Sequence, residues 1–305
     1  MKFIKKLVFC LVCLALVFSG VTAYANQITI ENKSGHLLYI YDFDQSVRQT
    51  VFKTQLQDGQ SYQLTMRERK NQANKVANRI YFAAKPLTHT LEKSGVTVDP
   101  DPTNMTNDGK VMFSFAEYNY EGSRYTVDTS YIDVFSYPIT LKFSANQTGV
   151  CKKDFEYGPT SFLTIKKALL DQGSPWSDLV WNESGMYRIL GPNKIWPFKE
   201  SKNIPPDVPS SYRNFITKLP PTGHQLFGSQ TENFAGWLFS DEKNMAILKT
   251  GYVKALRSAA RPDNPTADVT KQRFGFYIFP KDGLAEFTDL STSNHCTITV
   301  YPYDK

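Results

Sequence analysis

Three carboxylic side chains lie close together in a stretch of sequence that is otherwise typical of β-strands. Residues 113–143 read FSFAEYNYEGSRYTVDTSYIDVFSYPITLKF and place Glu117, Asp128 and Asp133 among aromatic and β-branched neighbours. Two carboxyl groups held at a fixed separation can divide proton transfer between them, one donating a proton and the other activating water. The stretch therefore has the residue types that general acid and base catalysis needs, although composition alone favours the simpler interpretation that Glu117 and Asp133 are carboxylates at solvated strand ends.

Other catalytic constellations are missing from the sequence. The four histidines have no metal-binding spacing and are more typical of surface or packing residues, so we expect no metal site: His36, His89, His224 and His295. The sequence also lacks a nucleophile elbow, a phosphate-binding loop and a dinucleotide fingerprint. We therefore expect an activity that needs no cofactor.

The N-terminal segment has the form of a secretory signal peptide. Three lysines precede an apolar run over residues 7–21, and Ala23-Tyr24-Ala25 offers a small-x-small cleavage site. The run is shorter than the roughly 20 residues that a membrane-spanning helix needs. We expect cleavage after Ala25 and a mature chain that is exported, extracellular or periplasmic, and not held in a membrane.

The charge and the cysteines of the mature chain also limit its partners. The formal net charge of +6 includes the three signal-peptide lysines, so 6 − 3 = +3 remains on 305 − 25 = 280 residues. This mild excess, without a basic cluster, does not suggest nucleic acid as a partner, and we expect a monomer. Cys151 and Cys296 remain, and in an oxidising compartment they either pair across a long loop or stay reduced.

Short strands separated by turn residues dominate residues 26–150. Asn32-Lys-Ser-Gly35 and Asp58-Gly59 each divide two strand-like runs, and this spacing favours a sandwich or a barrel. Breaks near residues 120–123 and at Tyr137-Pro138 divide the carboxylate stretch. We therefore expect its acidic residues to lie on neighbouring strands.

From Cys151 onward the pattern becomes helical. Residues 161–173 have helical periodicity ending at Gly173, residues 210–221 form a shorter helical segment, and residues 240–260 form the longest one, with Gly251 as a weak point. Strand patterns return at residues 273–279 and 295–302. The sequence predicts a mainly β chain with a core of residues 26–150 and 268–305 and a mainly helical (α/β) insertion domain of residues 151–267.

All of the tryptophans lie in the predicted insertion: Trp176, Trp181, Trp196 and Trp237. The apolar faces of sugar rings stack on aromatic side chains, although a single tryptophan is more often a packing residue. As a group, beside paired carboxylates, these residues favour a carbohydrate-binding site.

The carboxylate stretch resembles that of the thaumatin-like proteins. Phe-Ala-Glu117-Tyr, followed by Asp128-Thr-Ser-Tyr-Ile-Asp133-Val-Phe-Ser-Tyr-Pro, is similar to their A-E-F strand and their D-x-S-x-V-D-G-F-x-x-P run. In that family the glutamate and the two aspartates line an acidic cleft. Residues 28–35, 56–64, 78–81, 277–282 and 296–302 are similar to further segments of the family.

Two departures distinguish the branch that the chain resembles. Plant thaumatin-like proteins contain many disulfides, whereas this mature chain has two cysteines and a long insertion. Both features are closer to the β-1,3-glucanases of glycoside hydrolase family 64, which share the thaumatin-like β core and have a catalytic glutamate and aspartate. The spacing of Glu117 and Asp133, 133 − 117 = 16, is similar to that family's. Ala83 and Gly283 stand where many thaumatin-like proteins have an arginine and an aspartate.

The resemblance implies a fold and an activity. A thaumatin-like β-sandwich or barrel core and the insertion would flank the cleft. The activity would be that of a secreted endo-β-1,3-glucanase acting on glucans such as laminarin and curdlan. The alternative is a thaumatin-like protein that binds glucan without cleaving it.

The resemblance also implies roles for individual residues. Glu117 would be the general acid, because its apolar flanks are expected to raise its pKa, and Asp133 the general base of an inverting reaction. Asp128 would either bind sugar hydroxyls or be a plain strand-end residue. Further substrate-binding candidates are Tyr118, Asn119 and Asp282.

Overall fold

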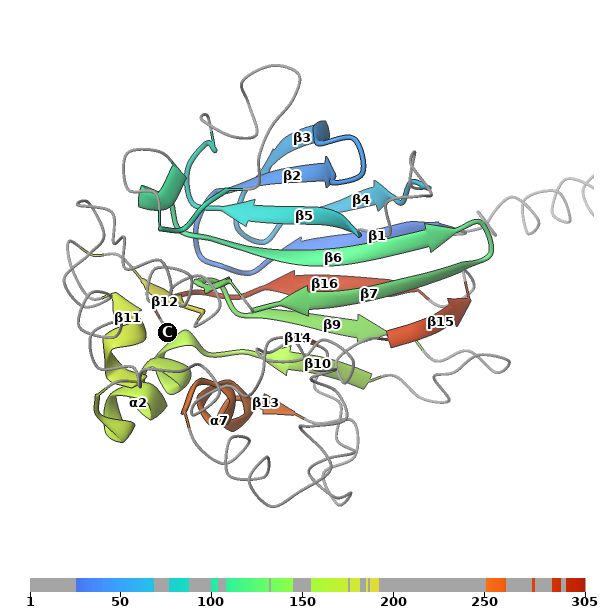
Figure 1. Cartoon of the computed structure of the whole chain (residues 1–305). Helices are drawn as coiled ribbons and strands as arrows, with labels where there is room; N and C mark the ends of the chain where they lie inside the picture. The colour runs from blue at the N-terminus through green and yellow to red at the C-terminus, as the bar shows by residue number, and fades with distance from the viewer. Residues whose placement is uncertain are drawn as a thin grey trace, which may run out of the picture.

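The computed structural model describes residues 26–68, 77–87, 100–103, 108–131, 133–144, 155–174, 176–181, 185, 187–191, 251–261, 276–277, 287–291 and 295–304. Two β-sheets lie face to face, and the described helices gather beside one end of them (Figure 1). The predicted mainly β fold is confirmed. None of the described helices is long and apolar enough to cross a membrane.

The sheet that carries the carboxylate stretch has the strand order β14-β7-β6-β5-β2-β3, and β15 also pairs with β7. Every neighbouring pair on this path is antiparallel except β14 and β7. Its strands are β2 (Leu38–Asp44), β3 (Gln49–Leu56), β5 (Asn78–Ala83), β6 (Phe113–Glu121), β7 (Arg124–Ser130), β14 (Phe276–Tyr277) and β15 (Phe287–Ser291).

The second sheet has the order β13-β10-β9-β16-β1-β4. Its strands are β1 (Gln27–Asn32), β4 (Ser61–Thr65), β9 (Ile139–Phe143), β10 (Phe155–Pro159), β13 (Ala260–Arg261) and β16 (Cys296–Val300). Strand β16 lies between β9 and β1 and runs parallel to β1. Cys296 is buried at the start of β16, whereas Cys151 lies outside the described residues, so their pairing stays a prediction.

The main hydrophobic core lies between the two sheets. Strands of both sheets contribute fully buried side chains to one cluster, among them Ile30, Ile40, Ile80, Val127 and Ile298. Strand β10 extends the second sheet although it belongs to the segment predicted as an insertion. The division of the chain into domains otherwise stays a prediction.

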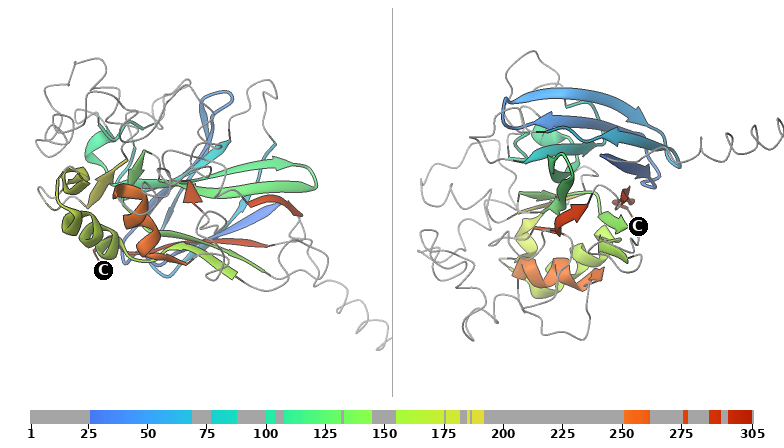
Figure 2. Two further views of the ribbon diagram at one scale, coloured as in Figure 1. Left: turned by 60° about the horizontal axis from the view of Figure 1, so that its bottom comes forward. Right: turned by 90° about the vertical axis from the view of Figure 1, so that its right-hand side faces the viewer.

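The helices pack beside a small third sheet, at the side of the molecule away from β2 and β3 (Figures 1 and 2). These elements are β8 (Val134–Phe135), β11 (Val180–Trp181), β12 (Arg188–Leu190), α2 (Phe162–Gln172), α7 (Gly251–Ser258) and the 3₁₀ turn η2 (Trp176–Leu179). A further 3₁₀ turn, η1 (Asp108–Lys110), precedes β6. Ser161 caps α2 by accepting the N–H of Thr164, and Gly173 ends it, which confirms the predicted helix. The predicted helix at residues 210–221 and the first part of that at 240–260 lie outside the described residues.

A two-residue turn joins β6 to β7. Gly122 has a φ of 67°, which suits glycine, and with Ser123 it connects Glu121 to its cross-strand partner Arg124. Because the turn fixes the register of the hairpin, every step back along β6 is matched by one step forward along β7. Glu117 lies four residues before Glu121, and Asp128 lies four residues after Arg124, so Glu117 and Asp128 face each other.

The approach to β6 is held by a buried arginine. The guanidinium of Arg188 donates to the carbonyl oxygens of Pro102 at 2.9 Å, Gly109 and Val111. It also lies over the ring of Trp181, 5.5 Å from its centroid. Trp181 is thus part of the interior rather than an exposed sugar platform, and Arg188 stabilises the segment from which β6 begins.

Candidate active site

A row of three charged side chains crosses the centre of the large sheet. Arg79 of β5 pairs with Glu117 of β6, and Glu117 pairs in turn with Asp128 of β7. Directly opposed residues of antiparallel strands point to the same face, with Cβ atoms roughly 5 Å apart. The structure thus brings Glu117 and Asp128 together and adds a cation that was not among the predicted site residues.

Arg79 forms an ion pair with Glu117. Its Nε lies 2.8 Å from Oε1 of Glu117, and the side chains are 17% and 12% exposed. The guanidinium lies over the ring of Phe115, 4.6 Å from its centroid, and this contact fixes its orientation. The pair stabilises the ionised form of Glu117, which is opposite to the effect that burial was expected to have on this carboxyl group.

Asp133 lies in the bend between β7 and β8. Its carbonyl oxygen accepts the N–H of Gly191 at 2.8 Å, just beyond the end of β12. The next residue, Val134, belongs to the buried apolar cluster that contains Phe115, on which Arg79 lies. The bend therefore returns to the face of the sheet that carries Glu117.

The segment after Asp133 is tied directly to β6. Oγ of Ser114 accepts the N–H groups of Ser136 at 3.0 Å and of Tyr137 at 2.9 Å. Ser114 is fully buried and lies three residues before Glu117 along β6. One short side chain thus links the strand that carries Glu117 to the residues that follow Asp133 and β8.

The other predicted site residues have different positions. Asn119 is half-buried on the same face as Glu117, and its Nδ2 donates to Oγ1 of Thr126 at 3.3 Å. Asp128 is buried, with 4% of its surface exposed. Asp282 lies outside the described residues, so its role stays a prediction.

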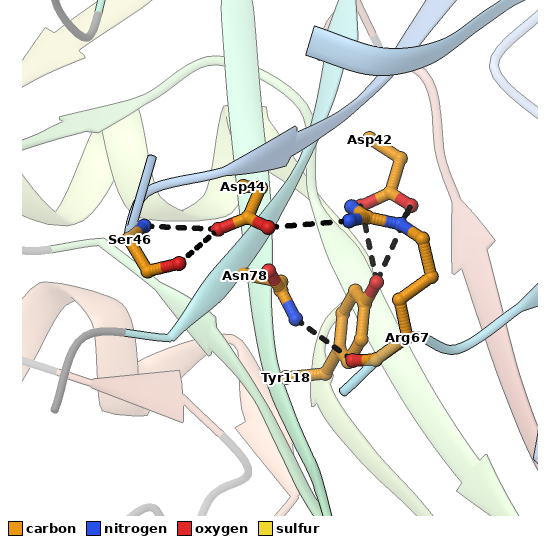
Figure 3. A network of polar contacts seen from close by, with 6 residues as sticks. All are labelled: Asp42, Asp44, Ser46, Arg67, Asn78 and Tyr118. Carbon is orange, nitrogen blue, oxygen red and sulfur yellow. Dashed lines mark hydrogen bonds and ion pairs between the residues drawn. The ribbon is translucent and has the colours of Figure 1, made fainter. Parts of the chain in front are cut away.

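Tyr118 lies on the opposite face of the sheet, in the main core. Its side chain is fully buried, and its hydroxyl lies 3.1 Å from Oδ1 and 3.3 Å from Oδ2 of Asp42 (Figure 3). Adjacent residues of a strand point to opposite faces, so Tyr118 points away from the side chain of Glu117. We therefore assign Tyr118 to the core and correct the expectation that it binds substrate.

The hydroxyl of Tyr118 belongs to a buried polar network that is centred on the ion pair of Arg67 with Asp42. Arg67 contacts both oxygens of Asp42, with Nε 3.0 Å from Oδ2 and Nη2 2.9 Å from Oδ1, and its Nη1 lies 3.5 Å from Asp44. Asn78 donates to the Arg67 carbonyl at 3.1 Å (Figure 3). Burial raises the pKa of Asp42, although Arg67 and Tyr118 oppose this, and burial also raises the pKa of Tyr118.

The described part of the chain shows no group of three histidine, cysteine, aspartate or glutamate side chains that could hold a metal ion. The arrangement on the outer face instead offers carboxyl groups and one arginine. Such groups can donate and accept protons and bind hydroxyl groups.

The sequence itself contains a signal for the positions of Arg79 and Tyr118. The alternation within Asn78–Ala83 places Arg79 on one face with Tyr81, and the same alternation separates Tyr118 from Glu117. The link from Ser114 to Ser136 and Tyr137 has no comparable local pattern.

Comparison with known families and structures identifies relatives of the chain. The family model described as β-1,3-glucanase, glycoside hydrolase family 64, matches residues 15–218, which are 204 of the 305 residues. This match includes both Glu117 and Asp133. No curated protein matches the sequence significantly.

The solved structures that resemble the chain are distant in sequence. A laminaripentaose-producing β-1,3-glucanase of family 64 from Paenibacillus barengoltzii, complexed with laminarihexaose, is 14% identical with a TM-score of 0.57, covering 90% of this chain and 75% of that chain. A second structure of the enzyme from that organism gives 14% and 0.53 with the same coverage. A laminaripentaose-producing β-1,3-glucanase in complex with laminaritetraose is 17% identical with a TM-score of 0.42, and the match covers 60% of this chain and 55% of that chain. At 14% identity the likeness to the two Paenibacillus barengoltzii structures concerns the fold.

Proposed function

Because the chain belongs to the β-1,3-glucanases of glycoside hydrolase family 64, we propose that it is an exported enzyme that hydrolyses β-1,3-glucan within the polymer. The observation that carries this proposal is the family match over residues 15–218, which spans the whole carboxylate stretch. The outer face of the large sheet supports it, because that face groups Glu117 with Asp128 and is joined to the bend that carries Asp133.

In the proposed mechanism the two carboxyl groups act on opposite faces of the sugar. Glu117 protonates the glycosidic oxygen, and Asp133 activates the water that attacks the anomeric carbon. Inversion requires room for that water, which corresponds to a carboxyl separation of roughly 6.5–9.5 Å. Asp128, next to Glu117, contributes negative charge to the cleft and binds sugar hydroxyls.

Arg79 places a condition on this assignment. A general acid must carry a proton, whereas the ion pair of Arg79 with Glu117 favours the carboxylate. Protonation of Glu117 therefore requires the pair to weaken when glucan binds. The partial exposure of both side chains allows a sugar to approach the pair.

The decisive experiment compares substrates that differ in their need for acid catalysis. The mature chain from Asn26 is incubated with laminarin and curdlan, and released oligosaccharides and their anomeric form are followed. Glu117→Gln and Asp133→Asn should each lower kcat on laminarin by about 10³-fold, within the range of general acid or base catalysis. An aryl laminarioside with a strongly acidic leaving group should restore turnover to Glu117→Gln but not to Asp133→Asn.

The alternative function is glucan binding without turnover. It predicts that the wild-type chain sediments with insoluble curdlan and releases no oligosaccharide. Release by the wild type and its loss in both carboxyl variants would exclude that alternative. Turnover of laminarin by Glu117→Gln at the wild-type rate would instead refute the proposed roles.

Export is proposed on the N-terminal sequence. The chain should be recovered outside the cytoplasm of its producing cell with Asn26 at its N-terminus. N-terminal sequencing of the recovered protein tests this, and an intact Met1 on the active protein would contradict it.

A further inference from the structure

The bend that carries Asp133 is closed by a tyrosine. Tyr131 is fully buried, and its hydroxyl contacts the backbone of Ile139 twice. It accepts the N–H of Ile139 at 2.9 Å and lies 3.3 Å from its carbonyl oxygen. The side chain of Tyr131 thus bridges from the end of β7 to the start of β9, and it closes the loop of chain between Tyr131 and Ile139, which contains Asp133.

A second tyrosine reaches this loop from α7. The hydroxyl of Tyr252 donates to the carbonyl oxygen of Tyr131, although the residues are 121 positions apart in the chain. Tyr252 is 2% exposed and belongs to the main hydrophobic core, as do Ala255 and Leu256 on the next turn of the helix. Spacings of three and four residues place these side chains on the face of α7 that packs against the interior.

The hydroxyl of Tyr252 stays protonated in this position. Burial raises the pKa of Tyr252 well above its ordinary value, and the charges of Tyr131 and Asp133 raise it further. The hydroxyl therefore remains a donor over the working range of a glycosidase.

Elements from the predicted insertion hold the loop at further points. Gly191, after β12, donates its N–H to the carbonyl oxygen of Asp133 at 2.8 Å. Phe162 of α2 stacks on Phe135 with ring centroids 5.6 Å apart and an interplanar angle of 5°. Residues 162, 191 and 252 thus contact Phe135, Asp133 and Tyr131, respectively.

We propose that Tyr252 is a positioning residue for the hydrolytic reaction, because the pair Tyr252–Tyr131 sets the backbone from which the Asp133 side chain projects. This inference rests on the proposed function. The helix α7 would thus contribute to catalysis by holding the base Asp133 in place. A base that is displaced by a fraction of an ångström activates water less well.

Tyr252→Phe is the direct test, because it removes the hydroxyl and keeps the ring in the core. The variant should lower kcat on laminarin roughly tenfold while KM stays within about twofold, since a misplaced base affects the transition state rather than ground-state binding. The acid limb of the kcat/KM profile, which reports the base in the free enzyme, should also move from its wild-type position.

Tyr137→Phe is the matched control. Tyr137 is a fully buried tyrosine of the same loop, and its hydroxyl has no hydrogen-bond partner in the described part of the chain. This variant should keep the kcat and the pH profile of the wild type. Hydrogen exchange over residues 131–139 should be faster in Tyr252→Phe than in Tyr137→Phe.

The outcomes separate the two proposals. If the wild type hydrolyses laminarin and Tyr252→Phe matches Tyr137→Phe in kcat, acid limb and exchange, the positioning role is refuted and the proposed function stands. If the wild type hydrolyses no glucan, both are refuted. Should Tyr252→Phe melt below the assay temperature, wild type and both variants are compared below the melting point of Tyr252→Phe. The same kcat-selective loss is expected there, and an unchanged kcat would overturn the inference.

Discussion

The two faces of the large sheet carry similar ion pairs in different surroundings. On the core face, Arg67 binds Asp42, whose side chain is 1% exposed, and Tyr118 adds a further contact to the same carboxylate. On the outer face, Arg79 binds Glu117, whose side chain is 12% exposed. The residues Tyr118 and Glu117 are neighbours in sequence, so the direction of a side chain separates the two environments.

The difference shows that solvent exposure determines whether an ion pair only stabilises the fold or can also bind a ligand and change its protonation. A carboxylate that receives several donors and no solvent is locked, and its contribution is to stability. A carboxylate with one face open can exchange its cation for a ligand and change its protonation. The variants below test whether the core pair governs folding and the outer pair governs the pH dependence of activity.

The largest effect is expected for Arg67→Met. Removing the cation leaves Asp42 and Asp44 as buried carboxylates, which should lower the free energy of unfolding by about 3–5 kcal/mol at neutral pH. Burial already raises the pKa of Asp42 although Arg67 opposes this, so the loss of Arg67 raises that pKa further, and stability is lost as the pH rises through it. The deficit relative to wild type should therefore shrink as the pH falls toward 4.

Denaturant melts of wild type and variant at several pH values measure this deficit. Arg124→Met is the control, since Arg124 is exposed on β7 and its replacement should change stability by no more than about 0.5 kcal/mol. A pH-independent deficit, or one equal to that of the control, would contradict a locked carboxylate network.

Arg79→Gln should have a smaller effect on stability and a clear effect on the pH profile. Loss of a partly exposed ion pair should cost about 1 kcal/mol of unfolding free energy. Without the cation, the proton on Glu117 is retained to higher pH, so the basic limb of the kcat/KM profile should move upward. A basic limb that stays in place, or moves downward, would show that Glu117 is not the acid that Arg79 controls.

Tyr118→Phe should have the smallest effect. It removes one hydrogen bond to Asp42, so the free energy of unfolding should fall by about 1–2 kcal/mol while kcat and KM on laminarin remain those of the wild type. Steady-state kinetics beside a melting curve separates the two quantities. A rise in KM with unchanged stability would instead show that Tyr118 contributes to substrate binding.

Much of the fold could be predicted because its signals are local. The mainly β class follows from short alternating runs, and the end of α2 follows from Gly173, whose φ of 69° suits glycine. The position of Glu117 opposite Asp128 also follows from the sequence once Gly122-Ser123 is taken as a two-residue turn.

The remaining features depend on contacts between distant parts of the chain. The link from Tyr252 to Tyr131 joins α7 to the end of β7, and no period in the sequence relates the two positions. The error over Tyr118 has a different origin, since it came from proximity to Glu117 along the chain. In a strand, the residue after a site residue faces away from the site, whereas the second one, Asn119, faces it again.

The place of β16 in the second sheet has a consequence for the time course of folding. Ile28 of β1 pairs with Cys296 of β16, and β16 separates β1 from β9, so this sheet remains in two parts until residues 296–300 are available. Pairings that close nearly the whole length of a chain are slow to form, since the entropy of loop closure precedes their stabilisation. The ribosome must release residues 296–300 before this sheet can be completed, and that delay suits a chain that crosses a membrane unfolded, as the proposed export requires.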